Sequence, residues 1–201
     1  MQRGNARFVA GEPRHPRQDV ERRNELAHTQ TPRAALFGCA DSRLAAEIIF
    51  DKGLGDLFVI RNAGQVISDS VVGSLEYAVA VLDVPLIIVL GHDECGAVRA
   101  AIDSTSLDSP ALPAAIWRQI APIVPAVRRV LRAGADTGVT TSSVDAEEVG
   151  REHLRDTVTE LLHTSELIST AVAAGRLGIV GANYRLGEGT AVPDVMVGIA
   201  D

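Results

Sequence analysis

The clearest signal in the sequence is a run of five consecutive aliphatic residues at positions 86–90, with no polar residue between them. A β-branched-rich run without alternation is typical of a strand that is buried on both faces of a parallel sheet. Residues 69–82 show a different pattern, because apolar side chains recur every three or four positions from Val72 to Leu82. That spacing predicts an amphipathic helix.

The same two patterns alternate along the chain from residue 34 onward. Strands are predicted at residues 34–37, 56–60, 86–90, 177–182 and 195–199. Helices are predicted at residues 44–50, 69–82, 114–132, 145–162 and 166–174. Pro122 and Pro125 are expected to interrupt the third helix, and residues 103–113 and 133–143 to form loops. Strands and helices in alternation predict an α/β fold with a mainly parallel central sheet flanked by helices.

The first 33 residues differ from the rest of the chain because they are polar and contain several arginines and prolines. Within them, residues 4–9 and 20–28 have a helical pattern. We therefore expect an N-terminal helical arm over residues 1–33 and an α/β domain over residues 34–201. At this length the two parts form one domain overall.

Composition narrows the class of protein. The chain has 201 residues with 26 acidic and 19 basic side chains, a formal net charge of −7, and its 46% hydrophobic content is globular. The acidic balance disfavours a nucleic-acid partner, which needs a basic face. Residues 86–90 are far shorter than the roughly 20 residues of a membrane span, and the first residues contain no apolar signal core. We expect a cytoplasmic protein with no nucleic-acid or membrane partner.

Both cysteines of the chain lie where a predicted strand ends. Cys39 follows the strand at 34–37, while His92 and Cys95 follow the strand at 86–90. The carboxyl ends of parallel strands lie at one edge of the sheet, so the two loops can meet there. Two thiolates and an imidazole suit Zn²⁺, and three protein ligands leave a fourth position open, as in catalytic zinc sites. Taken singly, a cysteine beside a strand is more often a packed core residue.

Asp41 and Arg43 extend the candidate zinc site. Asp41 lies two residues after Cys39, so its carboxylate could fill the fourth zinc position or accept a hydrogen bond from the group that does. Arg43 can form a local ion pair with Asp41, orient its carboxylate and compete with zinc for it.

Other candidate motifs are weaker. His153 and His163 lie on a predicted helix and are expected to be solvated or partly packed. Residues 187–189 (GEG) lack the spacing of a phosphate-binding loop, and an ordinary turn is the better interpretation.

The motifs around the two cysteines resemble those of a known family. Residues 39–43 (CADSR), 61–62 (RN) and 91–96 (GHDECG) are similar to motifs of the β-class carbonic anhydrases. The resemblance extends over nearly the whole chain. It implies a zinc lyase that reversibly hydrates CO2 to bicarbonate and a proton, with residues 34–201 as the zinc-binding catalytic domain.

The resemblance also implies roles for individual residues. Cys39, His92 and Cys95 would be the permanent ligands of one zinc ion per chain, which supplies a zinc-bound hydroxide. Asp41 would be either a fourth ligand in a closed site or, with Arg43, the dyad that orients the zinc-bound water in an open one.

Three further residues match substrate-binding positions of the family. Gln30 matches the glutamine that, in the plant-like branch, donates a hydrogen bond to bicarbonate across a subunit interface. Phe58 and Gly96 match positions that line that pocket. The match implies a homodimer or homotetramer in which Gln30 reaches the neighbouring subunit's site.

Two other functions are compatible with these residues, and a third fits them poorly. A hydrolase of CS2 or COS could share the fold, since those substrates are linear analogues of CO2. A non-catalytic zinc-binding module would use the same ligands. A phosphatase or reductase with Cys39 as nucleophile fits poorly, because its anion loop needs five residues before the arginine and Cys39 to Arg43 leaves three.

Overall fold

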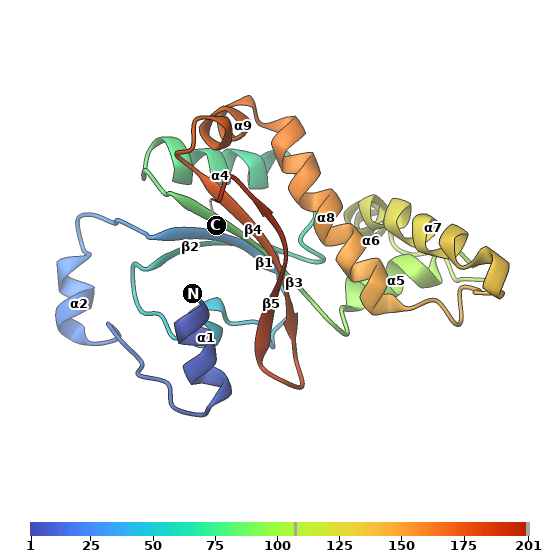
Figure 1. Ribbon diagram of the computed structural model, residues 1–201, viewed down its shortest axis with the longest axis horizontal. Helices are drawn as coiled ribbons and strands as arrows, with labels where there is room; N and C mark the ends of the chain where they lie inside the picture. Colours follow the sequence, from blue (N-terminus) through green and yellow to red (C-terminus); the bar gives the residue numbers. More distant parts are fainter. Residues whose placement is uncertain (107, 200–201) are drawn as a thin grey trace.

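A five-stranded sheet forms the centre of the molecule (Figure 1), as seen in the computed structural model, which describes residues 1–106 and 108–199. The strand order is β2-β1-β3-β4-β5. The first four strands in this order run parallel, and β5 pairs antiparallel with β4. The strands are β1 (Ala34–Cys39), β2 (Leu57–Asn62), β3 (Leu86–His92), β4 (Gly178–Arg185) and β5 (Thr190–Val197). This confirms the predicted α/β class with a mainly parallel sheet.

Nine α-helices are present in the described part of the chain. They are α1 (Gln2–Val9), α2 (Val20–Glu25), α3 (Ala46–Ile49), α4 (Asp69–Ala80), α5 (Gly96–Asp103), α6 (Ala114–Ile120), α7 (Val124–Ala133), α8 (Ala146–Thr164) and α9 (Glu166–Ala173). None of the helices described here is long and apolar enough to cross a bilayer.

Alternate residues of the buried strands pack on opposite faces of the sheet, as the pleat requires. Phe37 and Ile87 face the cluster formed with α4, α8 and α9. Leu36 and Ile88 face the other cluster, which includes α3 and receives Phe8 of α1. Figure 1 shows α4, α8 and α9 over one face and α1 against the other.

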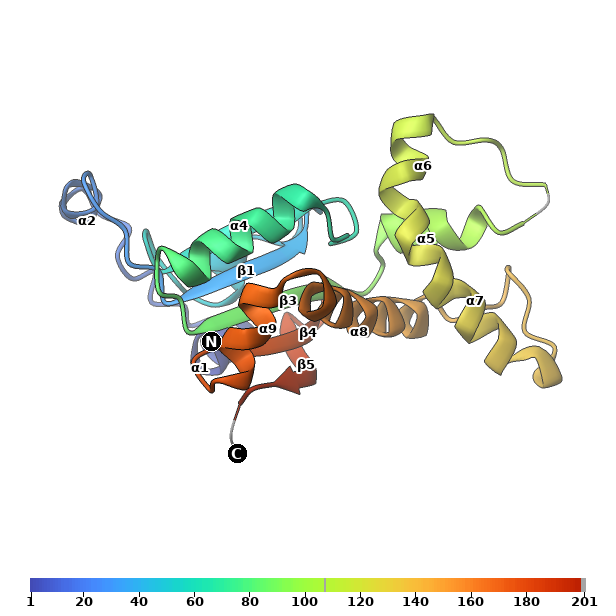
Figure 2. The same cartoon turned by 90° about the horizontal axis from the view of Figure 1, so that it is seen from above.

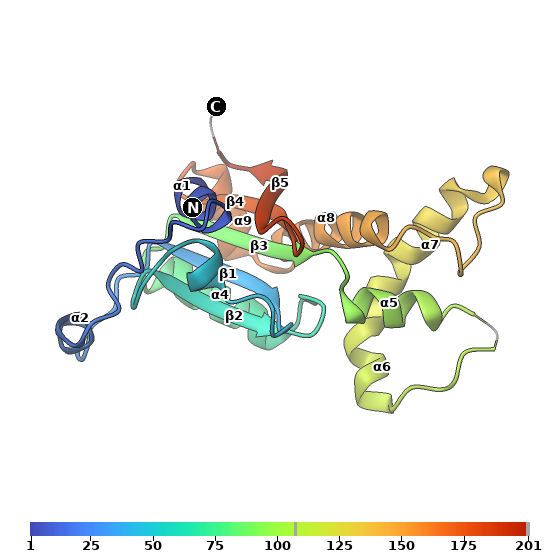
Figure 3. The same ribbon diagram turned by 90° about the horizontal axis from the view of Figure 1, so that it is seen from below.

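A helical lobe lies beyond the carboxyl ends of the strands. Figure 2 and Figure 3 show α5, α6 and α7 projecting from the end of β3, with α8 returning to the sheet. The lobe has its own apolar cluster, which includes Val98, Ile123 and Val149. Cys39 and Cys95 belong to this cluster, so they are buried between the sheet and the lobe.

Several element boundaries differ from those predicted from the sequence. No helix was predicted where α5 forms, and β5 was predicted to start at residue 195, whereas the strand begins at Thr190 after a tight turn. Pro193 lies within β5, where it is tolerated because this is an edge strand. The two prolines do interrupt the predicted third helix, since α6 ends at Ile120 and a 3-10 turn (Ala121–Ile123) precedes α7.

Buried polar side chains attach the N-terminal arm to the rest of the chain. Asn5 donates to the carbonyls of Ile49 (3.2 Å) and Gly189 (2.8 Å). Asp51 accepts hydrogen bonds from the Arg7 guanidinium (2.6 Å) and from backbone N–H groups of the arm. A second ion pair joins Arg17 to the buried carboxylate of Asp56. The arm is therefore part of the same folded unit.

Candidate metal centre

The two strand ends meet as the sequence predicts. Cys39 is the last residue of β1, His92 is the last residue of β3, and Cys95 precedes α5 as its N-cap. All three side chains are buried, and their two sulfurs and imidazole nitrogen lie within 4.8 Å of one another. The parallel register of β1 and β3 places the carboxyl ends of both strands at the same edge of the sheet.

The chemistry of these donors fits a zinc ion. His92 Nδ1 lies 2.7 Å from the carbonyl oxygen of Asp93, which can only accept, so Nδ1 carries the proton and Nε2 presents a lone pair. Nε2 is buried and has no hydrogen-bond partner among the residues that the structure describes. A buried nitrogen lone pair beside two thiols is the donor set that tetrahedral zinc prefers.

The two thiols influence each other's ionisation. A hydrogen bond from Cys95 lowers the pKa of Cys39 to about 4. Ionisation of Cys95 beside that thiolate is opposed, so the pKa of Cys95 is raised by its interaction with Cys39 and by burial. Both thiols could therefore be ionised together only with a cation between them.

Asp41 and Arg43 form the local pair predicted from their spacing. Arg43 donates to both carboxylate oxygens of Asp41, from Nε at 2.9 Å and from Nη2 at 2.7 Å, and its backbone N–H adds a third bond at 2.9 Å. These hydrogen bonds hold the pKa of Asp41 well below its usual range. Asp41 Oδ2 lies 4.0 Å from His92 Nε2, which puts the carboxylate at the edge of the donor cluster.

Three residues that were not assigned to the metal centre from the sequence support it. Arg61 donates to the carbonyls of Cys39 (2.9 Å) and Asp41 (2.5 Å). The N–H of Gly64 lies 3.3 Å from Cys39 Sγ, and His153 Nε2 lies 2.7 Å from the carbonyl oxygen of Gly64. His153 is only 3% exposed, so the expectation that it is solvated or partly packed was wrong. No sequence signal links His153 to Gly64, because the two are 89 residues apart.

The structure does not bring Gln30 to the metal centre of its own chain. Gln30 is exposed and precedes β1, whereas Cys39 ends β1. The six residues of that strand span about 17 Å.

Phe58 is also distant from the centre of its own chain, while Gly96 is adjacent to it. Phe58 lies four residues before Asn62, the β2 residue in register with Cys39, which is about 13 Å along the strand. Its ring packs against that of Tyr77, with centroids 6.1 Å apart. Gly96 directly follows Cys95 as the first residue of α5.

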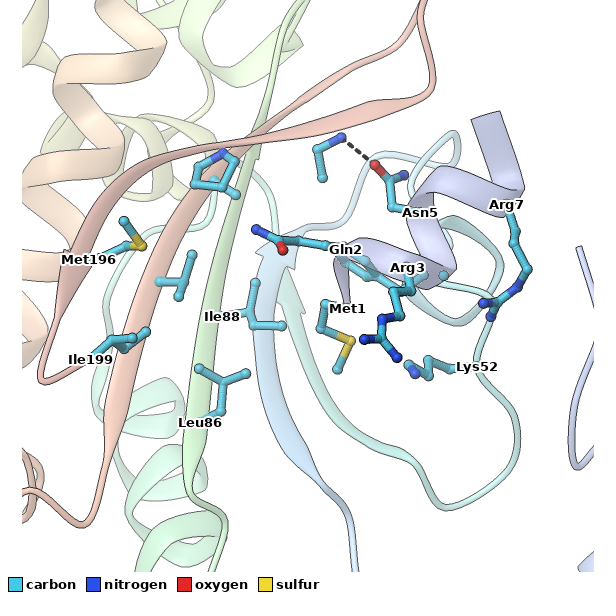
Figure 4. Close-up of a pocket in the computed structure, with 16 residues that line it drawn as sticks. Met1, Gln2, Arg3, Asn5, Arg7, Lys52, Leu86, Ile88, Met196 and Ile199 are labelled. Carbon is cyan, nitrogen blue, oxygen red and sulfur yellow. Dashed lines mark hydrogen bonds between the residues drawn. The ribbon is translucent and has the colours of Figure 1, made fainter. Parts of the chain in front are cut away.

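A separate groove of about 610 Å³ lies elsewhere on the molecule. Figure 4 shows Met1 with Gln2 and Arg3 of α1 on one side and Leu86 and Ile88 of β3 on the other. Among the residues that the structure describes, no cysteine or histidine lines this groove. It lies toward the amino end of β3, away from the carboxyl ends where α/β sheets bind their ligands.

Comparison with known proteins places the chain in a family. The family profile described as carbonic anhydrase matches residues 34–191. Carbonic anhydrase 2 of Mycobacterium tuberculosis is 50% identical over 193 residues, covering 96% of this chain and 88% of that protein. The carbonic anhydrase of Mycolicibacterium smegmatis is 50% identical over 186 residues, covering 92% and 86%.

Solved structures agree with the sequence relatives. The β-carbonic anhydrase CcaA is 26% identical with a TM-score of 0.71, and the match covers 90% of this chain and 83% of that one. The Coccomyxa β-carbonic anhydrase, solved in complex with acetazolamide, is 27% identical with a TM-score of 0.67, covering 85% and 75%. The chain therefore belongs to the carbonic anhydrase family, in its β class.

Proposed function

We propose that this protein catalyses the reversible hydration of CO2 to bicarbonate and a proton, using one zinc ion held by Cys39, His92 and Cys95. The observation that carries this proposal is the convergence of the three donor atoms within 4.8 Å, with His92 Nε2 buried and unpartnered among the described residues. When bound, zinc acts as a Lewis acid that lowers the pKa of a coordinated water. Because thiolate ligands must stay reduced, a reducing compartment such as the cytoplasm suits this site.

The proposed role of Asp41 is to orient a water and not to take up its proton. Arg43 keeps the pKa of Asp41 far below neutral, so the carboxylate is ionised and can only accept hydrogen bonds. An acceptor fixed beside the donor cluster fixes the direction of a water O–H and leaves an oxygen lone pair free for CO2. The proton that is released then leaves to solvent or buffer.

Arg43 sets how Asp41 is shared between two arrangements. In the structure the carboxylate makes three hydrogen bonds with Arg43. The competing arrangement has Asp41 on the metal as a fourth ligand, which would block the open position. The bidentate Arg43 pair therefore favours the arrangement that leaves this position accessible.

The surroundings of the donor cluster suit an apolar substrate. Cys39 and Cys95 pack in a cluster with Val66 and Val98, so the interior side of the centre is apolar. CO2 carries no charge and needs no polar partner to enter such surroundings. The bicarbonate anion needs a hydrogen-bond donor, and within one chain Gln30 is too far away to provide it.

We therefore propose a homodimer or homotetramer in which Gln30 and Phe58 act at the neighbouring subunit's centre. The exposed position of Gln30 at the amino end of β1 supports this arrangement. A structural neighbour from the ascomycete Sordaria macrospora, which is 22% identical with a TM-score of 0.75, is a tetrameric β-carbonic anhydrase.

Metal analysis combined with stopped-flow CO2 hydration tests the proposal. The wild-type protein should contain one zinc per chain and hydrate CO2. Cys95→Ser replaces a thiolate by a neutral hydroxyl and should lose most of both zinc and activity. His163→Ala, which changes a histidine outside the centre, should keep both. Full zinc content and full activity in Cys95→Ser would contradict the assignment.

A further inference from the structure

The turn formed by residues 62–66 presents a backbone N–H to one of the two sulfurs. It joins β2 to the segment before α4, and its Gly64 N–H is 3.3 Å from Cys39 Sγ. Gly64 and Gln65 both have positive φ, +80° and +40°. A Cβ at Gly64 would lie 2.9 Å from the Cβ of Ala97 and 3.0 Å from Ile123 Cδ1. Only glycine fits this close approach to the helical lobe.

Side chains of α6 and α8, which are distant in the sequence, hydrogen-bond to the same turn. Gln119 of α6 donates from Nε2 to the carbonyl of Ala63 at 2.9 Å. His153 of α8 donates from Nε2 to the carbonyl of Gly64 at 2.7 Å. Thr157, one helical turn later, lies 3.4 Å from the carbonyl of Gln65 and donates to its own helix at 2.8 Å. Two consecutive carbonyls, those of Ala63 and Gly64, thus accept side-chain hydrogen bonds from α6 and α8.

His153 is the buried member of this set. Since the Gly64 carbonyl can only accept, His153 carries its proton on Nε2. Burial lowers the pKa of His153, which keeps the ring neutral. Its Nδ1 has no hydrogen-bond partner among the described residues, so the contact with Gly64 is the polar contact that orients the ring.

We propose that His153, assisted by Gln119, is a positioning residue for the metal centre: it holds the 62–66 turn so that the Gly64 N–H points at Cys39 Sγ. This rests on the proposed zinc ligation by Cys39. A hydrogen bond to a ligand sulfur withdraws charge from it and fixes its orientation, and such outer partners tune metal affinity. His153 and Gln119 act on the metal centre only through the turn, because neither side chain hydrogen-bonds to a ligand atom.

The matched variants are His153→Leu, His153→Gln and His163→Leu. His153→Leu removes the donor and keeps an apolar side chain for the core. His153→Gln places an amide N–H where Nε2 was. His163→Leu changes a histidine on the same helix that lies away from the turn and serves as the control. The readouts are zinc affinity by chelator competition and the sulfur-to-cobalt charge-transfer band of the Co²⁺-substituted protein.

We expect His153→Leu to lose roughly ten- to hundred-fold in zinc affinity. Its charge-transfer band should move to longer wavelength, because a sulfur without its N–H partner gives up electrons more easily. His153→Gln should restore most of the affinity and the position of the band, and His163→Leu should match the wild type. Wild-type affinity and an unmoved band in a folded His153→Leu protein would overturn the inference.

Two further outcomes keep the test decisive. If His153→Leu does not fold, Gln119→Ala replaces it, with Arg118→Ala on the same helix as its control. Weaker zinc binding in Gln119→Ala than in Arg118→Ala supports the inference, and equal binding overturns it. A wild-type protein that binds no zinc would overturn the proposed function itself. That result is distinguishable from a failure of the inference, because the inference is tested by the ratio of zinc affinities between variants.

Discussion

Arg43 links the two loops that form the metal centre. Its guanidinium binds Asp41 in the loop after β1, and Nη2 also donates to the carbonyl of Glu94 in the loop after β3, at 3.1 Å. A lysine has a single ammonium group and lacks the planar fork needed for this arrangement. One side chain thus fixes both the direction of the Asp41 carboxylate and the spacing of the two loops.

Arg43→Ala should keep its zinc and lose roughly ten- to hundred-fold in CO2 hydration rate. Zinc is retained because Arg43 is not a ligand. Without Arg43 the pKa of Asp41 rises toward the ordinary value of about 3.9, which is still far below neutral. Titration of Asp41 therefore cannot account for a rate lost at neutral or alkaline pH. The measurement is stopped-flow hydration from neutral to alkaline pH with zinc content alongside.

Arg99→Ala is the matched control for that experiment. Arg99 is an exposed arginine on α5 that pairs with Asp103 and makes no contact with Asp41. It should leave the hydration rate at the wild-type level. An unchanged rate in Arg43→Ala across the same pH range would rule out the role given to the pair.

At the residue scale, the sequence predicts the donors but not their support. Cys39, His92 and Cys95 each follow an apolar run and a nearby glycine, and Asp41 and Arg43 are two residues apart, so these relations are local. The hydrogen bond between His153 and Gly64 depends on how α8 docks against the turn. Docking of that kind is decided by the packing of distant elements and leaves no pattern in the sequence.

At the element scale, a strong apolar pattern in the sequence was sufficient to predict a helix or strand, and a weak pattern was not. The buried runs of β1 and β3 and the repeat in α4 were predicted close to their final positions. The helix α5 was missed because it is short and its buried face consists only of Val98, Ala101 and Ile102. Edge strand β5 is half exposed and contains a proline, so its first residues lack the signature of a buried strand.

The docking of α1 gives a prediction at this scale. Gly4 is buried in α1, and a Cβ there would overlap the carbonyl oxygen of Phe50. Gly4→Ala should therefore push α1 away and reduce the free energy of unfolding by about 1–3 kcal/mol. Urea unfolding of the wild type and of Gly4→Ala measures this difference in the free energy of unfolding.

Gly73→Ala is the matched control for Gly4→Ala. Gly73 lies inside α4, is exposed, and its added Cβ would meet nothing within 4 Å. Replacing a glycine by alanine in a helix interior should raise the free energy of unfolding by about 0.5–1 kcal/mol. The two glycine-to-alanine changes should thus have opposite signs, and equal unfolding midpoints for both variants would contradict the docking argument.

At the scale of the whole molecule, buried carboxylates join the N-terminal arm to the sheet. Burial alone would raise the pKa of Asp51, but hydrogen bonds from Arg14, Arg7 and His15 outweigh it and lower the pKa. A group whose folded pKa is depressed contributes stability above its unfolded pKa, and that stability is lost as the pH falls through the folded value. The sequence predicted the arm as a polar segment, and its anchoring depends on carboxylates more than 30 residues away.

Asp51→Asn should lower the free energy of unfolding near neutral pH by about 1.5–3 kcal/mol, since the bonds to a charged acceptor are weakened. Asparagine suits the test because Asp51 has a positive φ of 47°, a conformation that asparagine also adopts. Below about pH 4 the wild-type advantage should shrink, because the wild-type carboxylate becomes protonated. Urea unfolding at several pH values measures this, and a constant difference between the two proteins would contradict it.

The proposed oligomer predicts that two inactive variants complement each other. Gln30 lies at the amino end of β1, and the full length of that strand separates it from Cys39. A Gln30 that acts at all must therefore act in a neighbouring subunit. Gln30→Ala and Asp41→Ala each damage every site in a pure oligomer. In a mixed dimer, the Asp41→Ala subunit supplies its Gln30 to the metal centre of the Gln30→Ala subunit, whose Asp41 is intact.

Refolding the two variants together at equal amounts should thus restore about a quarter of the wild-type hydration rate, since half of the dimers are mixed and each has one complete site of two. Each variant refolded alone serves as the baseline, and sedimentation confirms that the mixture is oligomeric. Complementation requires subunit exchange, so variants mixed without unfolding should regain activity only as fast as subunits exchange. A refolded, oligomeric mixture no more active than the mean of its two components would show that Gln30 does not serve the neighbouring site.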